Sequence, residues 1–318
     1  MRKVLVTGGA GFIGTNLVRA LINSGKEPRV LDDFSTGLTA NLRNLEVEVY
    51  EGSLEDLEIV HEAAQGVDAI VHLGARGSVP RSLKNPLATH MVNATGTLNV
   101  LEAARKNGAQ LIFSSSSSVY GMNEELPKNE KMWTSPMTPY AASKLAGEGY
   151  SEAYQSSFGV EVAVFRLFNV FGPWQRPDHD YAAVIPKWIW KAMNGQNIEV
   201  FGDGKQTRDF TYVDTVIQLI METLNRRIGW SGPLNLALGN TVTLLQVIEA
   251  LRLHFPNLKV NFQEKRHGDV LHSQNDPTHL NKVFPNIKQV DFNEALGETI
   301  NWMRSNSFKV VGGPKVLD

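Results

Sequence analysis

Cysteine is absent from this chain of 318 residues, which excludes disulfide bonds and thiolate chemistry. Charge of one sign is also lacking, because 31 Lys and Arg nearly balance 33 Asp and Glu. The net charge of −2 therefore gives no general attraction to nucleic acid or to an anionic membrane. No apolar run is long enough to span a bilayer, and no signal peptide is visible, so we expect a cytoplasmic protein without a membrane partner. We also expect no metal site.

The first half of the chain alternates between short apolar runs and segments with helical spacing. The apolar runs lie at 4–6, 30–31, 47–49, 69–73, 111–113 and 162–165, with helical stripes at 17–22 and 91–104. Fully apolar strands that alternate with helices predict a doubly wound parallel sheet of the α/β class, covered on both faces. After about Gly172 the alternation becomes irregular, which predicts a second, smaller domain.

A glycine-rich segment, Thr7-Gly-Gly-Ala-Gly-Phe-Ile-Gly14, follows the first strand and opens a helix. Its glycines permit a tight turn and let backbone N–H groups approach a pyrophosphate at the helix N-terminus. Asp32 ends the second strand, where a carboxylate accepts hydrogen bonds from an adenosine ribose and repels a 2′-phosphate, which favours NAD over NADP. The alternative is a glycine-rich turn beside a surface aspartate.

Tyr140 and Lys144 lie four residues apart, so in a helix they share one face. A phenol has an unperturbed pKa of about 10, and a nearby ammonium favours its ionised form. Five serines from Ser114 to Ser118 follow a strand, so some hydroxyls lie at its carboxyl end, where ligands bind in this fold class. These groups supply the acid–base chemistry for an alcohol that is oxidised, or a ketone that is reduced, beside a nucleotide-binding loop. Alone, the Tyr–Lys spacing is common, and a serine run is more often a polar loop.

Together these motifs resemble the extended short-chain dehydrogenase/reductases, specifically the NAD-dependent epimerase/dehydratase group and most closely the UDP-hexose 4-epimerases. The matching stretches are 7–14, 31–37, 96–104, 114–121, 140–144, 201–204, 208–209 and 266–269. The resemblance implies a Rossmann-like NAD-binding domain over 1–172. It implies a smaller C-terminal α/β domain for a UDP-sugar over 173–318, with part of 208–224 packing back on the first domain.

The resemblance also assigns roles. Tyr140 is the catalytic acid/base, Lys144 holds the nicotinamide ribose and lowers the pKa of the tyrosine, and Ser116 is the hydroxyl partner. The implied NAD-binding residues are Gly8, Gly11, Phe12, Ile13, Gly14, Asp32, Asp33, Ser53, Leu54, Leu73, Gly74, Ala75, Asn93, Ser114, Tyr140 and Lys144. The implied substrate-binding residues are Ser116, Asn169 for a phosphate oxygen, Phe201 stacking on uracil, Arg208 and Arg266 for the diphosphate, Asp269 for the uridine ribose, and Ser273. From the residues alone, surface ion pairs and a core aromatic are the favoured interpretations of the arginines and Phe201.

Three departures from relatives bear on the reaction. The sugar-nucleotide 4,6-dehydratases carry acids directly after the catalytic hydroxyl, whereas this chain has Ser117 and Ser118, so no carboxylate is available there for elimination. Ser53 replaces an aspartate that contacts adenine, which predicts a weaker contact. Gly74 replaces an alanine and would leave more room beside the pyrophosphate.

Ser273 falls where epimerases limit the space near the sugar 2-substituent. A tyrosine there resembles enzymes restricted to glucose and galactose, and a small residue resembles those that admit N-acetyl sugars. We therefore expect UDP-N-acetylglucosamine and UDP-N-acetylgalactosamine as substrates, with UDP-glucose and UDP-galactose as further ones. The alternative is an uninformative surface serine.

The expected mechanism is a transient oxidation. Tyr140 takes the proton of the sugar 4-hydroxyl directly or through Ser116, hydride passes to NAD, and the 4-keto sugar turns before hydride returns to its other face. A UDP-glucuronate 4-epimerase, with Arg81 or Arg176 for the carboxylate, and a net sugar-nucleotide reductase remain alternatives. A non-catalytic NAD-binding sensor is a third, against which the intact acid–base set argues. Helices near 88–107 and 140–157 resemble those that pair in homodimers of this family.

Overall fold

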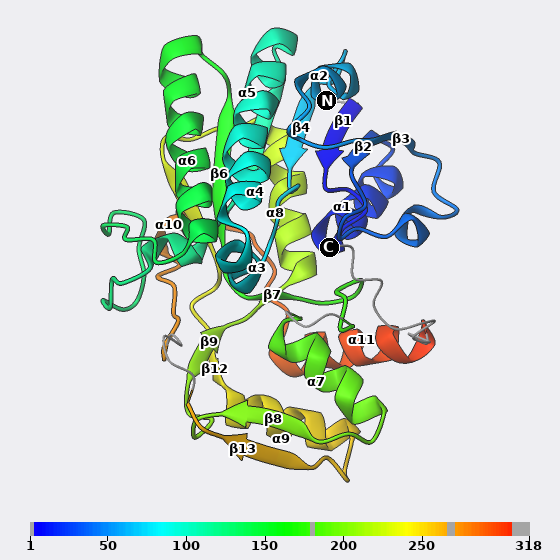
Figure 1. The fold of residues 1–318 in the computed structure, drawn as a ribbon, viewed down its shortest axis with the longest axis vertical. Coiled ribbons are helices and arrows are strands. Elements are labelled where there is room, and N and C mark those ends of the chain that lie inside the picture. The colour runs from blue at the N-terminus through cyan, green and yellow to red at the C-terminus, as the bar shows by residue number, and fades with distance from the viewer. Residues whose placement is uncertain (1–2, 179–181, 266–270, 307–318) are drawn as a thin grey trace.

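A single seven-stranded parallel sheet organises the larger part of the protein (Figure 1). The computed structural model describes residues 3–178, 182–265 and 271–306. The strands run in the order β11-β6-β5-β4-β1-β2-β3. Their bounds are β1 Lys3–Thr7, β2 Glu27–Asp32, β3 Glu48–Glu51, β4 Ala69–His72, β5 Gln110–Ser116, β6 Val162–Leu167 and β11 Pro233–Leu236. The predicted doubly wound α/β fold is confirmed.

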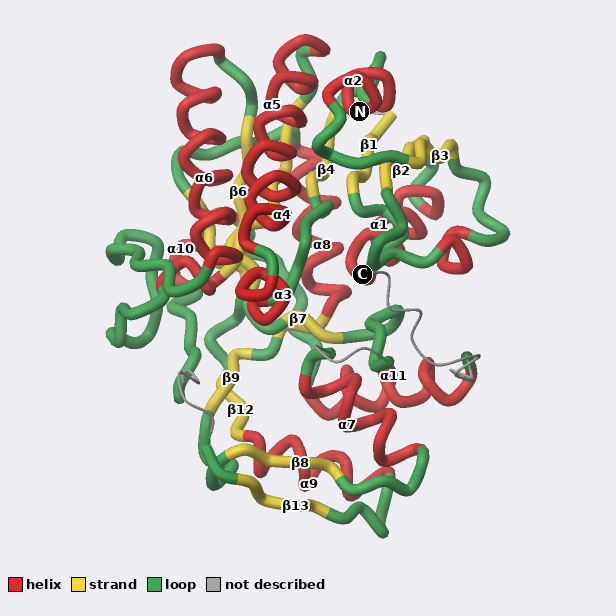
Figure 2. Tube along the Cα trace, in the orientation of Figure 1, coloured by secondary structure: helices red, strands yellow, loops and turns green. Residues whose placement is uncertain are grey.

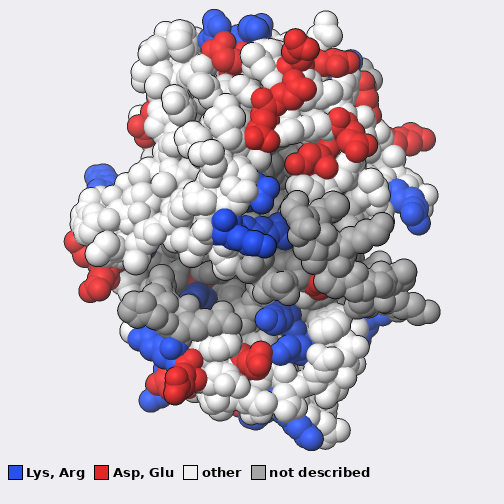
Figure 3. All heavy atoms as spheres, in the orientation of Figure 1, with Lys and Arg blue, Asp and Glu red and all other residues white. Residues whose placement is uncertain are grey.

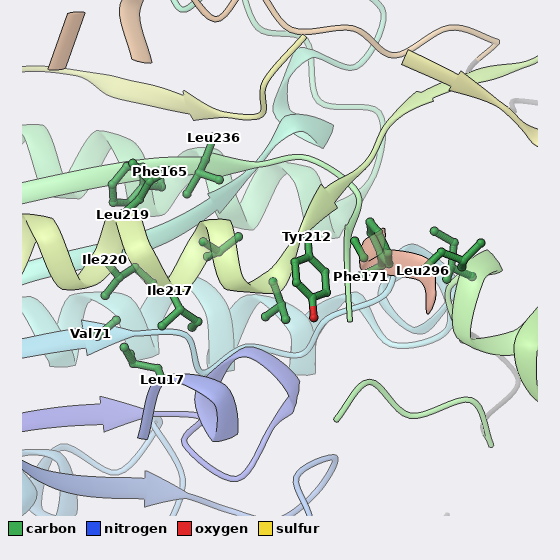
Figure 4. Packing of buried hydrophobic residues seen from close by; sticks show 14 of the residues in the cluster. Leu17, Val71, Phe165, Phe171, Tyr212, Ile217, Leu219, Ile220, Leu236 and Leu296 are labelled. Carbon is green, nitrogen blue, oxygen red and sulfur yellow. The ribbon is translucent and has the colours of Figure 1, made fainter. Parts of the chain in front are cut away.

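Helices cover both faces of this sheet because the strands are apolar on both sides. On β1, Val4 and Val6 pack with helices α1 (Phe12–Asn23) and α8 (Val213–Arg226), whereas Leu5 packs on the opposite face. That opposite face is covered by α2 (Leu57–Ala63), α5 (Gly96–Asn107) and α6 (Pro139–Phe158). Figure 4 shows the first of these layers, with Leu17 from α1, Val71 from β4 and Ile217 from α8 pointing toward one another. Burial of these side chains supplies the main stabilisation of the layers.

The smaller part lies beyond the carboxyl ends of the strands and contains short two-stranded sheets (Figure 1, with its helices and strands coloured in Figure 2). Strand β8 (Ile198–Phe201) pairs in parallel with β13 (Val260–Gln263), and β9 (Thr207–Asp209) pairs antiparallel with β12 (Thr241–Thr243). A third pair, β7 (Val170–Phe171) with β10 (Thr211–Tyr212), lies close to the larger part. The helices of this part are α7 (Val184–Met193), α9 (Leu244–His254) and α11 (Phe292–Ser305).

The return of the chain to the main sheet is more extensive than the expected 208–224. Helix α8 packs on α1, and β11 then adds a strand beside β6, so residues 213–236 belong structurally with the sheet. Sequence periodicity did not reveal β11, because an edge strand of four residues carries too short a pattern.

The remaining elements are short and connect the layers. They are η1 (Thr39–Leu42), α3 (Val79–Lys84), α4 (Pro86–His90), the π-helical turn η2 (Met91–Thr95), η3 (Ser117–Tyr120) and α10 (Thr278–Val283). Within the described ranges, no helix combines the length and apolar character needed to cross a membrane.

Helix α6, which carries Tyr140 and Lys144, has strong signals at both ends. The Thr138 side chain accepts a hydrogen bond from the Ala141 amide, Pro139 occupies the first turn, and Gly159 ends the helix with a left-handed φ of 68°. These caps set the start of the helix at Pro139, so Tyr140 lies in its first turn. That turn meets the carboxyl end of β5, where the serine run begins.

Candidate active site

The glycine loop between β1 and α1 is packed too closely to tolerate side chains. A Cβ atom on Gly14 would lie 2.1 Å from the Gly8 carbonyl oxygen, and one on Gly8 would lie 2.8 Å from the Gly74 Cα. Gly8 also has a φ of 69°, which favours glycine. Gly11 precedes α1 without a side-chain cap, and no acid lies in the first turn, which contains Phe12 and Ile13. The first turn of α1 therefore offers backbone N–H groups without a side-chain cap to an anion, as a dinucleotide pyrophosphate requires.

Asp32 lies at the carboxyl end of β2 beside this loop. Its carboxylate accepts hydrogen bonds from the amides of Ala10 and Phe34, both at 2.9 Å. Burial raises the pKa of Asp32, and the two amide bonds partly oppose that shift. Asp33, in contrast, is exposed and accepts from Ser35. Asp32 thus fits the position of the ribose-binding carboxylate, while Asp33 points its carboxylate to a surface turn.

Next to the glycine loop, Ser53 and Leu54 follow β3, and Leu73, Gly74 and Ala75 follow β4. The Ser53 hydroxyl is engaged with Glu55 at 3.2 Å. A Cβ on Gly74 would lie 2.8 Å from the Leu54 Cδ1, so the space gained by glycine is filled by leucine. Extra room beside a pyrophosphate at Gly74 stays a prediction.

His72 connects the cofactor loop to α5 through hydrogen bonds at both ring nitrogens. The Gly74 amide donates to the Thr7 hydroxyl at 3.1 Å, which leaves the Thr7 proton for His72 Nδ1 at 2.7 Å. On the other side, Thr97 donates to the Asn93 carbonyl, so it accepts from His72 Nε2 at 3.0 Å. This pattern assigns the Nε2–H tautomer. Burial, with a contribution from Lys144, lowers the pKa of His72 to about 3, so the ring is neutral.

Asn93 lies in the π-helical turn η2 and is almost fully buried. Its amide oxygen accepts from the Arg76 backbone at 2.7 Å, and its amide nitrogen donates to Ser143 at 3.0 Å. Ser143 in turn donates to the Tyr140 carbonyl at 2.8 Å. The side chain therefore holds the loop after β4 against the first turn of α6, and a contact of Asn93 with the cofactor stays a prediction.

Tyr140, Ser116 and Lys144 meet where β5 ends and α6 begins. The Tyr140 phenol is hydrogen-bonded to the Ser116 hydroxyl; burial raises the pKa of Tyr140, and this hydrogen bond opposes the shift. The Lys144 ammonium donates to the Ser114 carbonyl at 2.7 Å, and burial lowers its pKa to about 8. The Ser114 hydroxyl donates to the His72 carbonyl at 3.1 Å. In this structure burial thus dominates the pKa of Tyr140, and the lowering expected from Lys144 stays a prediction.

A buried ion pair lies next to the Ser116, Tyr140 and Lys144 side chains. Arg166 on β6 forms a two-point contact with Glu148 on α6, at 2.9 and 2.7 Å, with both side chains about 5% exposed. Ser115 also donates to Glu148, at 2.5 Å. Glu148 lies one helical turn beyond Lys144, and its charge raises the lysine pKa against the effect of burial. The ion pair and Ser115 therefore link β5, β6 and α6 close to the proposed catalytic residues.

Two of the expected substrate residues, Asn169 and Arg208, lie where the smaller part meets the sheet. A cavity of about 280 Å³ is lined by Asn169 and Arg208 together with Phe171, Phe210 and Leu244. Asn169 has a φ of 37° and donates to the Asp209 carbonyl at 3.2 Å. Phe201 does not line this cavity, so its stacking role stays a prediction.

Ser273 lies in a segment that bridges two parts of the site. Its amide donates to the Thr207 carbonyl at 3.2 Å, next to Arg208, while Lys128 pairs with Asn275 further along the same segment. The Arg208 guanidinium also donates to the Leu271 carbonyl at 3.4 Å. Arg266 and Asp269 lie outside the described residues.

Three features of this site were not found from the sequence. Ser118 donates to Ser116 at 2.9 Å, Phe210 forms the aromatic wall of the cavity, and Asp209 is fully buried. Two of them could have been found: the serine run includes Ser118, and the matched Arg208-Asp209 pair includes Asp209. Phe210 had no signal beyond its position after that pair.

Basic side chains gather on both sides of the recess between the larger and smaller parts (Figure 3). The protein as a whole carries a charge of −2, so this distribution is local. Such a recess concentrates anionic ligands, including diphosphates. Among the described residues, no three His, Asp or Glu side chains are grouped as metal ligands.

Comparison with known proteins agrees with this geometry. The profile of the "NAD dependent epimerase/dehydratase family" matches residues 4–237. A putative UDP-glucose 4-epimerase of Methanocaldococcus jannaschii is 31% identical, covering 96% of this chain and 99% of that protein. UDP-glucuronic acid decarboxylase 1 of Xenopus tropicalis is 32% identical, covering 95% and 72%.

Among solved structures, a UDP-N-acetylglucosamine 4-epimerase of Methanobrevibacter ruminantium M1, in complex with UDP-N-acetylmuramic acid, superposes with a TM-score of 0.91. It is 35% identical, and the match covers 96% of this chain and 99% of that one. Epimerases and a decarboxylase thus share this fold and similar identities, so the comparisons establish an NAD-dependent enzyme of sugar nucleotides without naming its reaction. The chain belongs to the NAD-dependent epimerase/dehydratase family.

Proposed function

We propose that this protein is a UDP-hexose 4-epimerase. The observation that carries the proposal is the corner formed by Ser116, Tyr140 and Lys144, with serines at 117 and 118. A hydroxyl hydrogen-bonded to a buried phenol can move a proton on and off a sugar hydroxyl. Elimination of water would require a further acid or base in the same turn, and serine supplies none.

In this proposal the glycine loop and Asp32 hold NAD, with its pyrophosphate at the N-terminus of α1. Bound NAD supplies a reversible acceptor for the hydrogen on the sugar C4. Tyr140 takes the proton of the 4-hydroxyl directly and later returns it, and Ser116 assists by donating a hydrogen bond to the phenolate. Lys144, held by the Ser114 carbonyl, contributes the positive charge that favours the phenolate.

The cavity lined by Asn169 and Arg208 is the proposed site of the UDP group. The Arg208 guanidinium lies at this cavity and bonds the Thr207 and Leu271 carbonyls, and its positive charge suits a diphosphate. If the cavity holds only the UDP part of the substrate, the hexose stays free to turn, as inversion at C4 requires. Residues 1–172 together with 213–236 then serve mainly NAD, whereas the rest of the described chain serves UDP, with Asn169 from the end of the first range.

We further propose that the hexose carries an N-acetyl group. Ser273 is small and half-buried. It lies on a segment that contacts Thr207 through the Ser273 amide and Lys128 through Asn275. Replacement by tyrosine should lower activity on UDP-N-acetylglucosamine and leave UDP-glucose activity largely intact. Full activity of Ser273→Tyr on the acetylated substrate would remove this argument, and Ser273→Ala serves as the size-matched control.

A UDP-uronate substrate is the second candidate, because Arg76 follows β4 with a buried Nε that has no hydrogen-bond partner in the structure. Such a guanidinium suits a carboxylate. Arg176, considered from the sequence for the same role, is instead bonded to Asp178 at 2.9 Å and to the Thr36 carbonyl. Arg81 lies on α3, whose first turn is capped by Ser78.

The experiment that tests the proposal is incubation of purified protein with UDP-N-acetylglucosamine, followed by NMR of the anomeric protons. Formation of UDP-N-acetylgalactosamine establishes 4-epimerisation of an acetylated sugar. Conversion of UDP-glucose alone keeps the mechanism and overturns the Ser273 argument. Conversion of UDP-glucuronate alone, or of nothing even with NAD added, overturns the assignment to UDP-hexoses.

We also propose a homodimer that pairs the outer faces of α4, η2 and α6. These neighbouring elements expose four large apolar side chains, Leu87 (72%), Met91, Tyr150 and Phe158. Exposed apolar side chains grouped on one surface are typical of a protein–protein interface. Leu87→Glu should produce a monomer in sedimentation analysis. Leu253→Glu, at an exposed leucine of α9, is the matched control and should leave the dimer intact.

A further inference from the structure

Ser116 receives two hydrogen bonds from Ser118. The Ser118 amide donates to the Ser116 Oγ at 3.2 Å, and the Ser118 hydroxyl lies 2.9 Å from the same oxygen. The first is the cap that starts the short helix η3, and it needs only backbone. The second has no such role, because the cap is complete without it.

The number of protons and lone pairs determines the direction of the second bond. A serine hydroxyl has one proton and two lone pairs. The Ser118 amide occupies one lone pair of the Ser116 oxygen, since an N–H group can only donate. If Ser116 gave its proton to Ser118, it would have none for Tyr140. Once Tyr140 is ionised, its oxygen has no proton and can only accept, so Ser116 stabilises the phenolate only by donating its proton there.

We propose that Ser118 is a positioning residue, whose hydroxyl donates to Ser116 and thereby directs the single Ser116 proton toward the Tyr140 oxygen. Both lone pairs of Ser116 are then occupied by Ser118, and the Ser116 proton has one acceptor. This inference rests on the proposed function and assigns a role within the same site.

The charged groups around this chain of hydroxyls come from three elements. Lys144 and Glu148 lie on α6, and Arg166 lies on β6. His72, on β4, is neutral. None of the four has a hydrogen bond with Ser118 in the described structure, so loss of the Ser118 hydroxyl acts on Tyr140 through Ser116.

The test uses the holoenzyme and the variants Ser118→Ala, Ser118→Thr and Ser117→Ala. Without the Ser118 donor, the Ser116 proton is less well directed, and the phenolate loses part of its stabilisation. The pKa on the acidic side of the kcat/KM profile should then rise, so that kcat/KM falls roughly 3- to 10-fold near neutral pH and recovers at higher pH. The loss should lie in kcat rather than KM. Threonine keeps the hydroxyl and should restore the profile.

Ser117→Ala removes a neighbouring hydroxyl that makes no hydrogen bond with Ser116 or Ser118 in the described structure, and it should behave as wild type. A loss in Ser118→Ala that is equal at all pH values, or that accompanies a lower Tm, would mean a structural role and would overturn the proposal. An unchanged profile would overturn it as well. So would failure of threonine to restore the profile.

A second measurement separates this proposal from the choice of substrate. Ultraviolet difference titration follows ionisation of Tyr140 in the holoenzyme without turnover, with Tyr140→Phe as the blank. A higher pKa in Ser118→Ala than in wild type supports the role of Ser118 even if no UDP-hexose is converted. An equal pKa contradicts it even if epimerisation is observed.

Discussion

The two ligand-binding edges of this protein are built in different ways. On the cofactor edge, the proposed site consists of four glycines within seven residues and the aspartate that ends the next strand, so it is mostly backbone. On the substrate edge, Asn169, Arg208 and Ser273 come from three segments that the smaller part brings together. The first edge is specified by local sequence, whereas the second depends on long-range packing. Ligand preference can therefore change at the second edge while the first stays the same.

The two edges also differ in buried charge. Around the cofactor edge, the deeply buried His72 is neutral and its hydrogen bonds are satisfied by threonines and backbone. At the substrate edge, Asp209 is fully buried, and one of its oxygens lacks a hydrogen-bond partner. Burying an ionised group without full compensation is unfavourable. Asp209 therefore makes the stability of the second edge depend on pH.

The largest effect should follow a change where the two edges meet. Tyr140→Phe removes the proposed acid/base and should lower kcat at least about 1000-fold, with Tm and NAD binding unchanged. Steady-state assays, thermal melts and NAD titration check these expectations. Tyr150→Phe makes the same change on an exposed part of α6 and should retain activity. Substantial activity in Tyr140→Phe would mean that another group takes the proton.

Gly14→Ala should disrupt the cofactor edge alone. The new Cβ would lie 2.1 Å from the Gly8 carbonyl oxygen and 2.7 Å from the Gly9 Cα, so the loop must open. We expect NAD affinity to fall about 100-fold or more by calorimetry, because the cradle depends on close backbone approach. Gly149→Ala, in an exposed position of α6 with no atom near its Cβ, should instead stabilise the protein by about 0.5–1 kcal/mol. Normal NAD binding by Gly14→Ala would contradict the local construction of this edge.

Asp209→Asn should alter how stability depends on pH. Burial raises the pKa of Asp209 from 3.8 to about 6, and backbone hydrogen bonds only partly oppose this. The folded state therefore favours the protonated carboxyl. Its stabilising contribution is fully present below pH 4 and is lost as pH rises through 6, which amounts to about 2–3 kcal/mol.

The asparagine variant stays neutral, so relative to wild type its free energy of unfolding should increase between pH 4 and 7. Urea melts at several pH values measure this difference. Asp203→Asn, which removes an exposed carboxylate, should show no such trend. A constant difference between Asp209→Asn and wild type would mean that Asp209 keeps an ordinary pKa.

Arg208→Gln should give the smallest of these effects and act on the substrate edge alone. We expect UDP affinity to fall about 10-fold by calorimetry, since one charge-assisted donor group is lost from a half-buried site, while NAD affinity stays unchanged. Arg252→Gln, on the surface of α9, removes the same charge elsewhere and should leave both affinities intact. An equal loss of NAD affinity in Arg208→Gln would show that the two edges are coupled.

Most of the cofactor edge could be predicted because its signals are local. The glycine spacing, the acid after β2 and the Tyr–Lys pair each lie within one strand–turn–helix unit, where periodicity and turn chemistry determine the geometry. The close contact of Gly74 with Leu54, from the turn after β3, was not predicted. Such a contact between two loops leaves no periodic trace in either segment.

The sequence by itself determined the fold class, the glycine cradle and the helix that carries Tyr140, because apolar periodicity and helix caps act over a few residues. Only the tertiary structure decided which hydroxyls surround Ser116, that Phe210 rather than Phe201 lines the cavity, and that β11 completes the sheet. These arrangements depend on side chains from distant segments competing for the same space. That competition is resolved by packing of the whole chain, which no short stretch of sequence encodes.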